Sequence, residues 1–422
     1  MVKTILGTSF TKILTAIIGF IIVVLNSRHL GAAGLGTISL IVLAISIILI
    51  VNEIVSGGAL VYLVPRYNIF SIIIASYVWT CINIFLFSLL LNFLHLVPHV
   101  YIGHVLALSF ILSLSSLHST ILIGKARINY YNITAIIQSL AAICTLIILF
   151  FLVHRVRIDS YIYSLYVSYS LAYFISLAGI LKYFDNINFK EISKVVPNMF
   201  RLGFFTQIAN ISQIFNYRLG YYLIDNFIGR ASLGKFSVGV QVAESTWLIG
   251  RSISTIHYSN VSNSDNKDQS RYSTILFVKF ITALTALLLL IILLLPNSLF
   301  EFVFGKDFSG IPWIIFSLSF GIISLSANMM FSAFFSGNGK IHLNTIGSFI
   351  GLVATLCFAF ILIPKYGIIG AAISNSISYC STTIYSLVVF ILSTKTKLRE
   401  FIINRNDFSR FLNSIKGLIK NE

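Results

Sequence analysis

Long apolar runs separated by short polar breaks dominate this chain. A helix needs about 20 residues to cross the ~30 Å hydrocarbon core of a bilayer, and the runs reach that length. We therefore predict twelve membrane-spanning helices, at residues 5–26, 34–56, 69–93, 101–123, 131–152, 160–181, 200–225, 232–257, 274–295, 312–336, 343–363 and 367–392. This pattern predicts an all-α polytopic membrane protein.

Composition supports that prediction. Of the 422 residues, 57% are hydrophobic and only 10% are charged, and the mean hydropathy is +0.93, which excludes an ordinary water-soluble domain. The chain has a basic residue, Lys3, near its start but no small-residue cleavage site, so we expect the first span to be retained. The four cysteines lie inside apolar runs without metal-ligand or disulfide spacing, and we interpret them as small core residues.

The formal charge of +16 follows from the predicted topology. Eighteen of the 29 lysines and arginines fall in, or within two residues of, segments that would be cytoplasmic if the N-terminus is inside, six fall outside, and five fall deeper within spans. Because positive loops stay on the cytoplasmic side, both termini are expected to be cytoplasmic. Nucleic acid is not needed to explain the charge.

Two glycine-rich phrases predict an internal repeat. "HLGAAGLG" (29–36) and "FIGRASLG" (227–234) each follow the first span of a half of the chain and precede the second. We predict that each is a tight extracytoplasmic hairpin. The repeat predicts two six-helix lobes with pseudo-twofold symmetry, at 1–195 and 196–394, joined by a charged loop at 182–199 and enclosing a cavity near the midplane.

The second phrase also imitates a nucleotide-binding motif. Residues 229–235 match the start of a phosphate-binding P-loop, but Phe236 follows where a Ser or Thr would hold magnesium. No strand precedes the phrase either. We therefore reject ATP binding at this position.

The tail, residues 395–422, differs from the rest of the chain. Apolar residues recur at helical spacing with Arg and Lys between them. We predict a basic amphipathic helix on the anionic cytoplasmic leaflet, with a frayed basic tail as the alternative.

Charges inside the spans are the strongest candidates for function, since each costs ~2.5–3.5 kcal/mol at a helix centre on insertion scales. The functional interpretation is a cationic cavity for an anionic substrate, with a carboxylate that binds a coupling proton or sodium ion. Guanidinium groups donate paired hydrogen bonds to phosphate oxygens, so a diphosphate fits such a cavity. The substrate-binding candidates are Arg218, Arg251, Lys12 and Lys279, and the ion-coupling candidates are Glu244, Asp225 and Glu53.

A structural interpretation competes with this one. The same charges would then pair with one another as packing devices, and the sequence leaves open whether Glu244 pairs with Arg251 on its own span or with Arg218 on the neighbouring one. The histidines show no repeated ligand spacing, so we predict neither a metal site nor a cofactor other than the coupling ion.

Four phrases together resemble the polysaccharide flippases, the Wzx-type O-antigen translocases. They are "LGAAGLGTISL", "GGALVYLVPRY", "IGRASLGKFSVGVQVAES" and "LIPKYGIIGAAISNSISY" (362–379). The most telling is "PKYGIIGAA" (364–372). These flippases belong to the superfamily of the MATE multidrug exporters and the lipid II flippase.

The resemblance implies a MATE-like fold in the bacterial inner membrane. It also implies movement of undecaprenyl-diphosphate-linked oligosaccharide, an O-antigen or lipopolysaccharide unit, to the periplasmic leaflet by alternating access, with cation antiport. Implied partners are membrane lipid, a polysaccharide polymerase and a chain-length regulator. In that family membrane-embedded basic residues line the cavity, which is similar to the role suggested for Arg218 and Arg251.

Three alternatives remain. A MATE-type drug exporter would share the fold, although cationic drugs favour an acidic cavity. A scramblase without ion coupling would need none of the acids. An enzyme is not expected, because the longest outside gap, 296–311, is too short to hold donor and acceptor.

Overall fold

The computed structural model describes residues 2–94, 96–184, 189–263, 266–402, 404 and 407. The chain forms two compact units, Met1–Ile211 and Ser212–Glu422. Every regular element among the described residues is a helix or helical turn. Helix α7 (Phe189–Phe227) contributes residues to both units, and each unit is described by itself.

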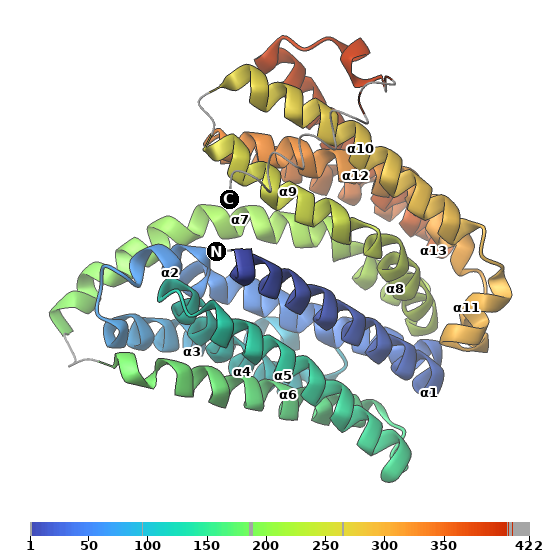
Figure 1. Ribbon diagram of the computed structural model, residues 1–422. Coiled ribbons are helices and arrows are strands. Elements are labelled where there is room, and N and C mark those ends of the chain that lie inside the picture. Colours follow the sequence, from blue (N-terminus) through green and yellow to red (C-terminus); the bar gives the residue numbers. More distant parts are fainter. Residues whose placement is uncertain are drawn as a thin grey trace. The chain divides into compact units, whose positions relative to one another are not determined.

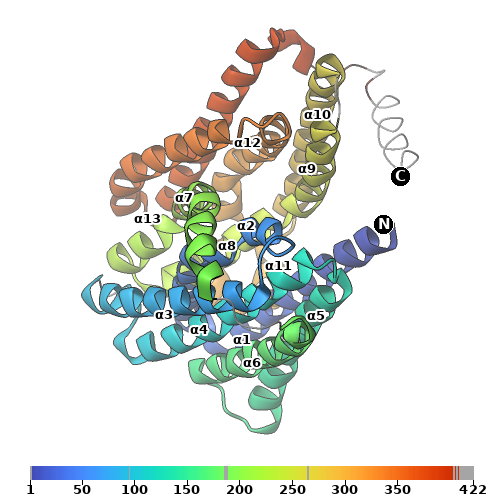
Figure 2. The same ribbon diagram turned by 90° about the vertical axis from the view of Figure 1, so that its left-hand side faces the viewer.

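The first unit is a bundle of long helices. Its elements are α1 (Val2–Ser56), α2 (Gly58–Leu63), α3 (Ile69–Leu94), α4 (His99–Gly124), α5 (Ile128–Ile147), a π-helical turn η1 (Ile148–Leu152), α6 (Ile158–Ile180), a 3-10 turn η2 (Leu181–Tyr183) and the start of α7. Helices α5 and α6 lie side by side, and α4 packs against α6 (Figures 1 and 2). Two apolar clusters fill the bundle, one around Ile41 and Leu146 and one around Leu117 and Ile121.

The second unit is also a bundle of helices. After the end of α7 come α8 (Arg230–Ser245), α9 (Trp247–Ser262), α10 (Lys267–Leu293), α11 (Asn297–Phe304), η3 (Lys306–Phe308), α12 (Ile311–Gly337), α13 (Ile341–Thr394) and η4 (Leu398–Phe401). Helix α12 packs against α13, α10, α9 and α8. Helix α10 runs beside α9 in both views (Figures 1 and 2). The core of this unit is aromatic, with Phe331, Phe334 and Phe390 in mutual contact.

The twelve predicted spans all fall on helices. Among the described residues, eight helical stretches are long and apolar enough to cross a membrane, and two of them, Phe10–Leu63 and Ile341–Thr394, each hold two predicted spans. The seventh and eighth predicted spans are not among the eight. Their helices are α7, whose face carries amides and charges, and α8 with α9, which are separated at Thr246.

Two glycines reverse the chain within the two longest helical stretches. Gly31 has φ +67° in α1 and Gly367 has φ +61° in α13, a region that side chains other than glycine rarely adopt. A Cβ on Gly370 would lie 2.0 Å from the carbonyl oxygen of Leu362, so the two halves of α13 meet closely beside the turn. The tight reversal predicted for "HLGAAGLG" is confirmed, and the "PKYGIIGAA" phrase makes a second one.

The predicted loop at 182–199 is wrong in part. Helix α7 begins at Phe189 and continues through Pro197, which therefore lies inside the helix and does not close a loop before it. Proline in a helix interior costs about 3 kcal/mol because it removes a backbone hydrogen bond. Two fully buried side chains, Val195 and Met199, pack into the Leu117 cluster and offset that cost. The predicted lobe boundary at 195 and 196 thus falls within a helix.

Most of the predicted amphipathic tail lies outside the described residues. Helix α13 ends at Thr394, its C-cap residue Lys395 has φ +55°, and the short turn η4 follows. Residues 403, 405–406 and 408–422 are outside the described part, so the tail helix stays a prediction.

Candidate functional site

An ion pair within the second unit joins α7 to α8. The two terminal nitrogens of Arg218 donate to the two carboxylate oxygens of Glu244, with Nη1 to Oε1 at 3.0 Å and Nη2 to Oε2 at 2.7 Å. The Arg218 side chain is 26% exposed and that of Glu244 is 14% exposed. Nη1 also donates to the hydroxyl of Tyr221 at 3.3 Å. The question that the sequence left open is settled for Glu244: its partner is Arg218 on α7.

Three aromatic rings form a wall next to this pair. The Tyr217 ring lies 5.3 Å from that of Tyr379 and 6.1 Å from that of Trp247, and Trp247 lies 6.0 Å from Tyr379. Trp247 is almost fully buried and its indole N–H donates to the carbonyl of Ile322 at 3.2 Å. These contacts bring α7, α9, α12 and α13 together, so the rings are held rigidly.

Arg251 extends from α9 beyond this wall. Its guanidinium lies over the Trp247 ring, 5.7 Å from the centroid, and its side chain is exposed. No acid among the described residues pairs with it. Tyr217 interacts electrostatically with Arg218, Glu244 and Arg251, so these three charges gather around one phenol. The site therefore carries two guanidinium groups against one carboxylate.

The helix is interrupted between Glu244 and Trp247. Thr246 keeps helical backbone angles, but its N–H bonds to the carbonyl of Ala243, three residues back, at 3.3 Å.

Asp225 and Lys279 are paired elsewhere. Asp225 accepts from Arg230 at 3.0 Å and 3.3 Å across the turn between α7 and α8. The ammonium of Lys279 donates to Asp407 at 2.8 Å, and both side chains are buried, at 9% and 6% exposed. The structure does not bring Lys279 to the Arg218 group.

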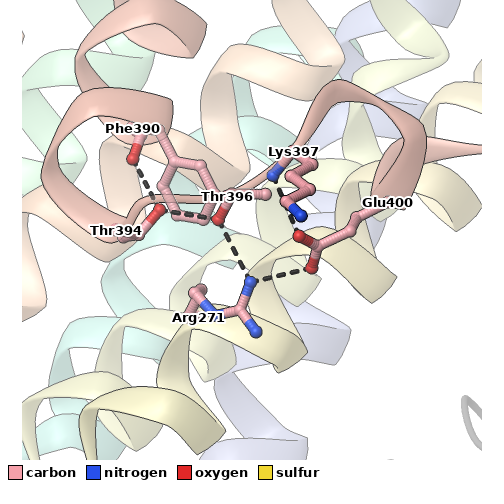
Figure 3. Close-up of polar contacts among 6 residues, drawn as sticks. All are labelled: Arg271, Phe390, Thr394, Thr396, Lys397 and Glu400. Carbon is pink, nitrogen blue, oxygen red and sulfur yellow. Dashed lines mark hydrogen bonds and ion pairs between the residues drawn. The ribbon is translucent and has the colours of Figure 1, made fainter.

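The Lys279 contact belongs to a junction between α10 and the segment after α13. Figure 3 shows its second part, in which Arg271 Nη1 donates to Glu400 at 2.8 Å and to Thr396 at 3.3 Å. Backbone N–H of Lys397 donates to the other oxygen of Glu400 at 2.9 Å. Burial is slight at Glu400, and these donors hold the pKa of its carboxyl below the usual 4.5, the Lys397 N–H first.

The remaining two candidates, Lys12 and Glu53, lie in the first unit. Lys12 is exposed on α1, and its ammonium makes no ion pair with any described residue. Glu53 is half-buried where α1 crosses α7 at Gly203, whose Cβ would lie 1.8 Å from the Ile54 carbonyl oxygen. No salt bridge of Glu53 is found in the described part of the chain. The amide of Gln207 lies next to Gly57, one turn from Glu53.

Sequence reasoning missed a buried polar cluster around Asn216. Its Oδ1 accepts from Thr355 at 2.8 Å and from Ser378, and Ser378 also donates to the Gly351 carbonyl at 2.6 Å. The cluster joins α7 to both halves of α13. Repeated Ser and Thr in apolar runs were the available signal, because such hydroxyls are needed to satisfy buried partners.

A cavity lies in the first unit, beside the "HLGAAGLG" turn. His29, Tyr101, Arg157 and Asp159 line a cavity of about 460 Å³. Nδ1 of His29 lies 2.9 Å from the Leu25 carbonyl. Among the described residues no group of His, Cys, Asp and Glu is arranged to hold a metal ion.

Comparisons with known proteins agree on family and fold. The sequence profile described as "Polysaccharide biosynthesis protein" matches residues 1–247. The capsular polysaccharide biosynthesis protein CapF of Staphylococcus aureus is 34% identical over 84 residues, which are 20% of this chain and only 21% of that relative's length. The fold is similar to that of three solved transporters.

The first of these is a structure of the lipid II flippase MurJ in an inward closed conformation, with a TM-score of 0.74 at 17% identity, covering 99% of this chain and 92% of that one. An inward-facing MATE family multidrug transporter of the MOP superfamily matches with a TM-score of 0.67 at 14% identity, covering 92% of this chain and 96% of that one. A MOP superfamily transporter from Pyrococcus furiosus matches with a TM-score of 0.61 at 16% identity, covering 93% of this chain and 96% of that one. Its binding pocket is described as of reverse polarity. At these identities the likeness shows the fold alone.

Proposed function

Because this chain belongs to the polysaccharide biosynthesis protein family, we propose that it is a flippase for lipid-linked oligosaccharide. Its substrate is undecaprenyl-diphosphate-linked oligosaccharide, which it moves from the cytoplasmic to the periplasmic leaflet of the inner membrane by alternating access. The polyprenyl tail stays in lipid, while the charged headgroup needs a polar path because it cannot cross hydrocarbon unaided.

One observation carries the proposal: the guanidinium of Arg251 has no acid partner in the described part of the chain, although it lies on the eighth predicted span. An unpaired charge in a membrane segment is costly, so it is retained for a ligand of opposite charge. A diphosphate next to an aromatic ring is such a ligand, and guanidinium groups bind phosphate through paired hydrogen bonds.

The drug-exporter alternative has less support. Export of cationic drugs favours an accessible acid, but the one carboxylate of this site, Glu244, is already bound by Arg218. With two guanidinium groups against one carboxylate, the site has a net positive charge and repels cations. The coupling cation, a proton or a sodium ion, and the partnership with a polymerase and a chain-length regulator are parts of the same proposal.

The test is flipping by purified protein in liposomes that contain fluorescent lipid-linked oligosaccharide. Replacing Arg218 and Arg251 together by Ala is expected to lower the flipping rate at least tenfold at matched protein levels. The matched control is Leu290→Ala on α10, a 54% exposed apolar residue, which should leave the rate unchanged. Equal rates in the double variant and the wild type would refute a cationic headgroup site. Drug efflux without flipping would favour the exporter instead.

A further inference from the structure

The two terminal nitrogens of the Arg218 guanidinium, which would bind a phosphate, are already occupied by Glu244. They point at the two oxygens of Glu244, in the same paired geometry that a phosphate would need. A phosphoryl group and the Glu244 carboxylate therefore cannot both bind those nitrogens. Nη1 of Arg218 also donates to the Tyr221 hydroxyl, which leaves even less room for a phosphoryl group.

Within the described part of the chain, Glu244 has no other positive group at hydrogen-bond distance. The titratable or charged groups around it are Tyr217, Arg218 and Tyr221 on α7, Arg251 on α9 and Tyr379 on α13. The phenols are neutral, and Arg251 makes no ion pair with Glu244. The carboxylate is 14% exposed, so it depends on Arg218 for its compensation.

We propose that a diphosphate displaces Glu244 from Arg218 and that the released carboxylate takes up a proton, so that substrate and proton bind together at this site. This inference rests on the proposed function. Two hydrogen bonds to the carboxylate break, two form to phosphoryl oxygens, and the proton comes from bulk water. A carboxylate stranded in a poorly hydrated place becomes neutral because its charged form costs several kcal/mol there.

The sign of this coupling matters for transport. By linkage, if substrate promotes protonation of Glu244, protonation must promote substrate binding by the same factor. A simple antiport needs the opposite, because the ion and the substrate must then compete for the carrier. An exchange of substrate for an incoming cation therefore needs a carboxylate outside the Arg218 pair.

The experiment measures the protons taken up per molecule bound. The full chain in detergent micelles is titrated with undecaprenyl diphosphate, by calorimetry in two buffers that differ in ionisation enthalpy. A cationic site alone makes a bound diphosphate release protons, so net uptake by the wild type cannot come from the ligand. Glu244→Gln is expected to take up about one proton fewer and to bind about tenfold more tightly at pH 8, because the competing charge is gone.

Glu400→Gln is the matched control, since it removes a carboxylate from a pair in the same unit whose arginine is equally exposed, at 26%. It should match the wild type in affinity and proton count. Equal proton counts in wild type and Glu244→Gln, or weaker binding by Glu244→Gln, would overturn the inference while leaving the proposed function standing. No binding by any of the three proteins would overturn both. If Glu244→Gln does not stay monodisperse, proton release by the wild type is enough to overturn the inference.

Discussion

The buried pair of Lys279 and Asp407 gives the sharpest stability prediction. The lysine nitrogen lies 2.8 Å from the carboxylate, and both side chains are more than nine-tenths buried. Removing one partner of such a pair leaves an uncompensated charge, which costs about 3–5 kcal/mol. We therefore expect Asp407→Ala to be strongly destabilising.

The magnitude can be stated as a melting temperature. In a domain of about 200 residues, each kcal/mol lost from the free energy of unfolding lowers the melting temperature by about 2–4 °C. Asp407→Ala should therefore lower the melting temperature by about 6–20 °C. Lys279→Met should cost less, because the Asp407 carboxylate keeps the backbone N–H of Asn404 as a donor at 2.8 Å and can take up a proton. The assay is the fraction of full chain that remains monodisperse in detergent after heating.

A double variant completes the cycle. Lys279→Met with Asp407→Leu removes both charges and fills the space, so the midpoint should return to within about 3 °C of the wild type. Additive losses in the double variant, or a shift below about 2 °C for Asp407→Ala, would refute the reasoning. Either result would also reopen the sequence-based assignment of Lys279 to a substrate cavity.

Three further predictions follow from packing and charge. Gly370→Val should lower the yield of monodisperse protein severalfold, because its Cβ would meet the Leu362 carbonyl at 2.0 Å; normal yield would disprove that contact. Trp247→Ala should cost about 3–5 kcal/mol from the cavity, seen as a lower melting temperature, and a shift within error would contradict its burial. The lowered pKa of Glu400 means that its hydrogen bonds from the Lys397 N–H and from Arg271 stabilise the fold above pH 4.5, the usual value, and stop doing so as pH falls through the lowered pKa. Glu400→Gln should therefore flatten the loss of melting temperature on acidification below pH 4.5, and an unchanged profile would count against the pair.

Hydrophobic patterning was a good guide to the helices and a poor guide to their ends. All twelve predicted spans fall on helices because burial in lipid demands long apolar runs with satisfied backbones. The loop predicted before Pro197 failed for a tertiary reason. The burial of Val195 and Met199 in the first unit outweighs the local preference of proline, and no window of the sequence shows which neighbours those residues will meet.

The candidate site was also only partly predictable from the sequence. Residue type and the cost of a charge in the membrane were enough to single out Arg218, Glu244 and Arg251. They could not say which charges pair, because a helix face offers each side chain several partners within reach. Lys279 shows the consequence, since its partner Asp407 lies 128 positions away in a segment that the sequence assigned to the membrane surface.

The sequence by itself determined that this is a polytopic helical membrane protein and where its helices reverse, and it singled out charges placed where charges are costly. These follow from local physics: the length of an apolar run, the backbone freedom of glycine and the price of burying an ion. Only the tertiary structure decided that Arg218 holds Glu244, that Asp225 and Lys279 are paired elsewhere, and that Arg251 stands without an acid among the described residues. Pairing depends on distances between side chains on different helices, which are set by how the helices pack.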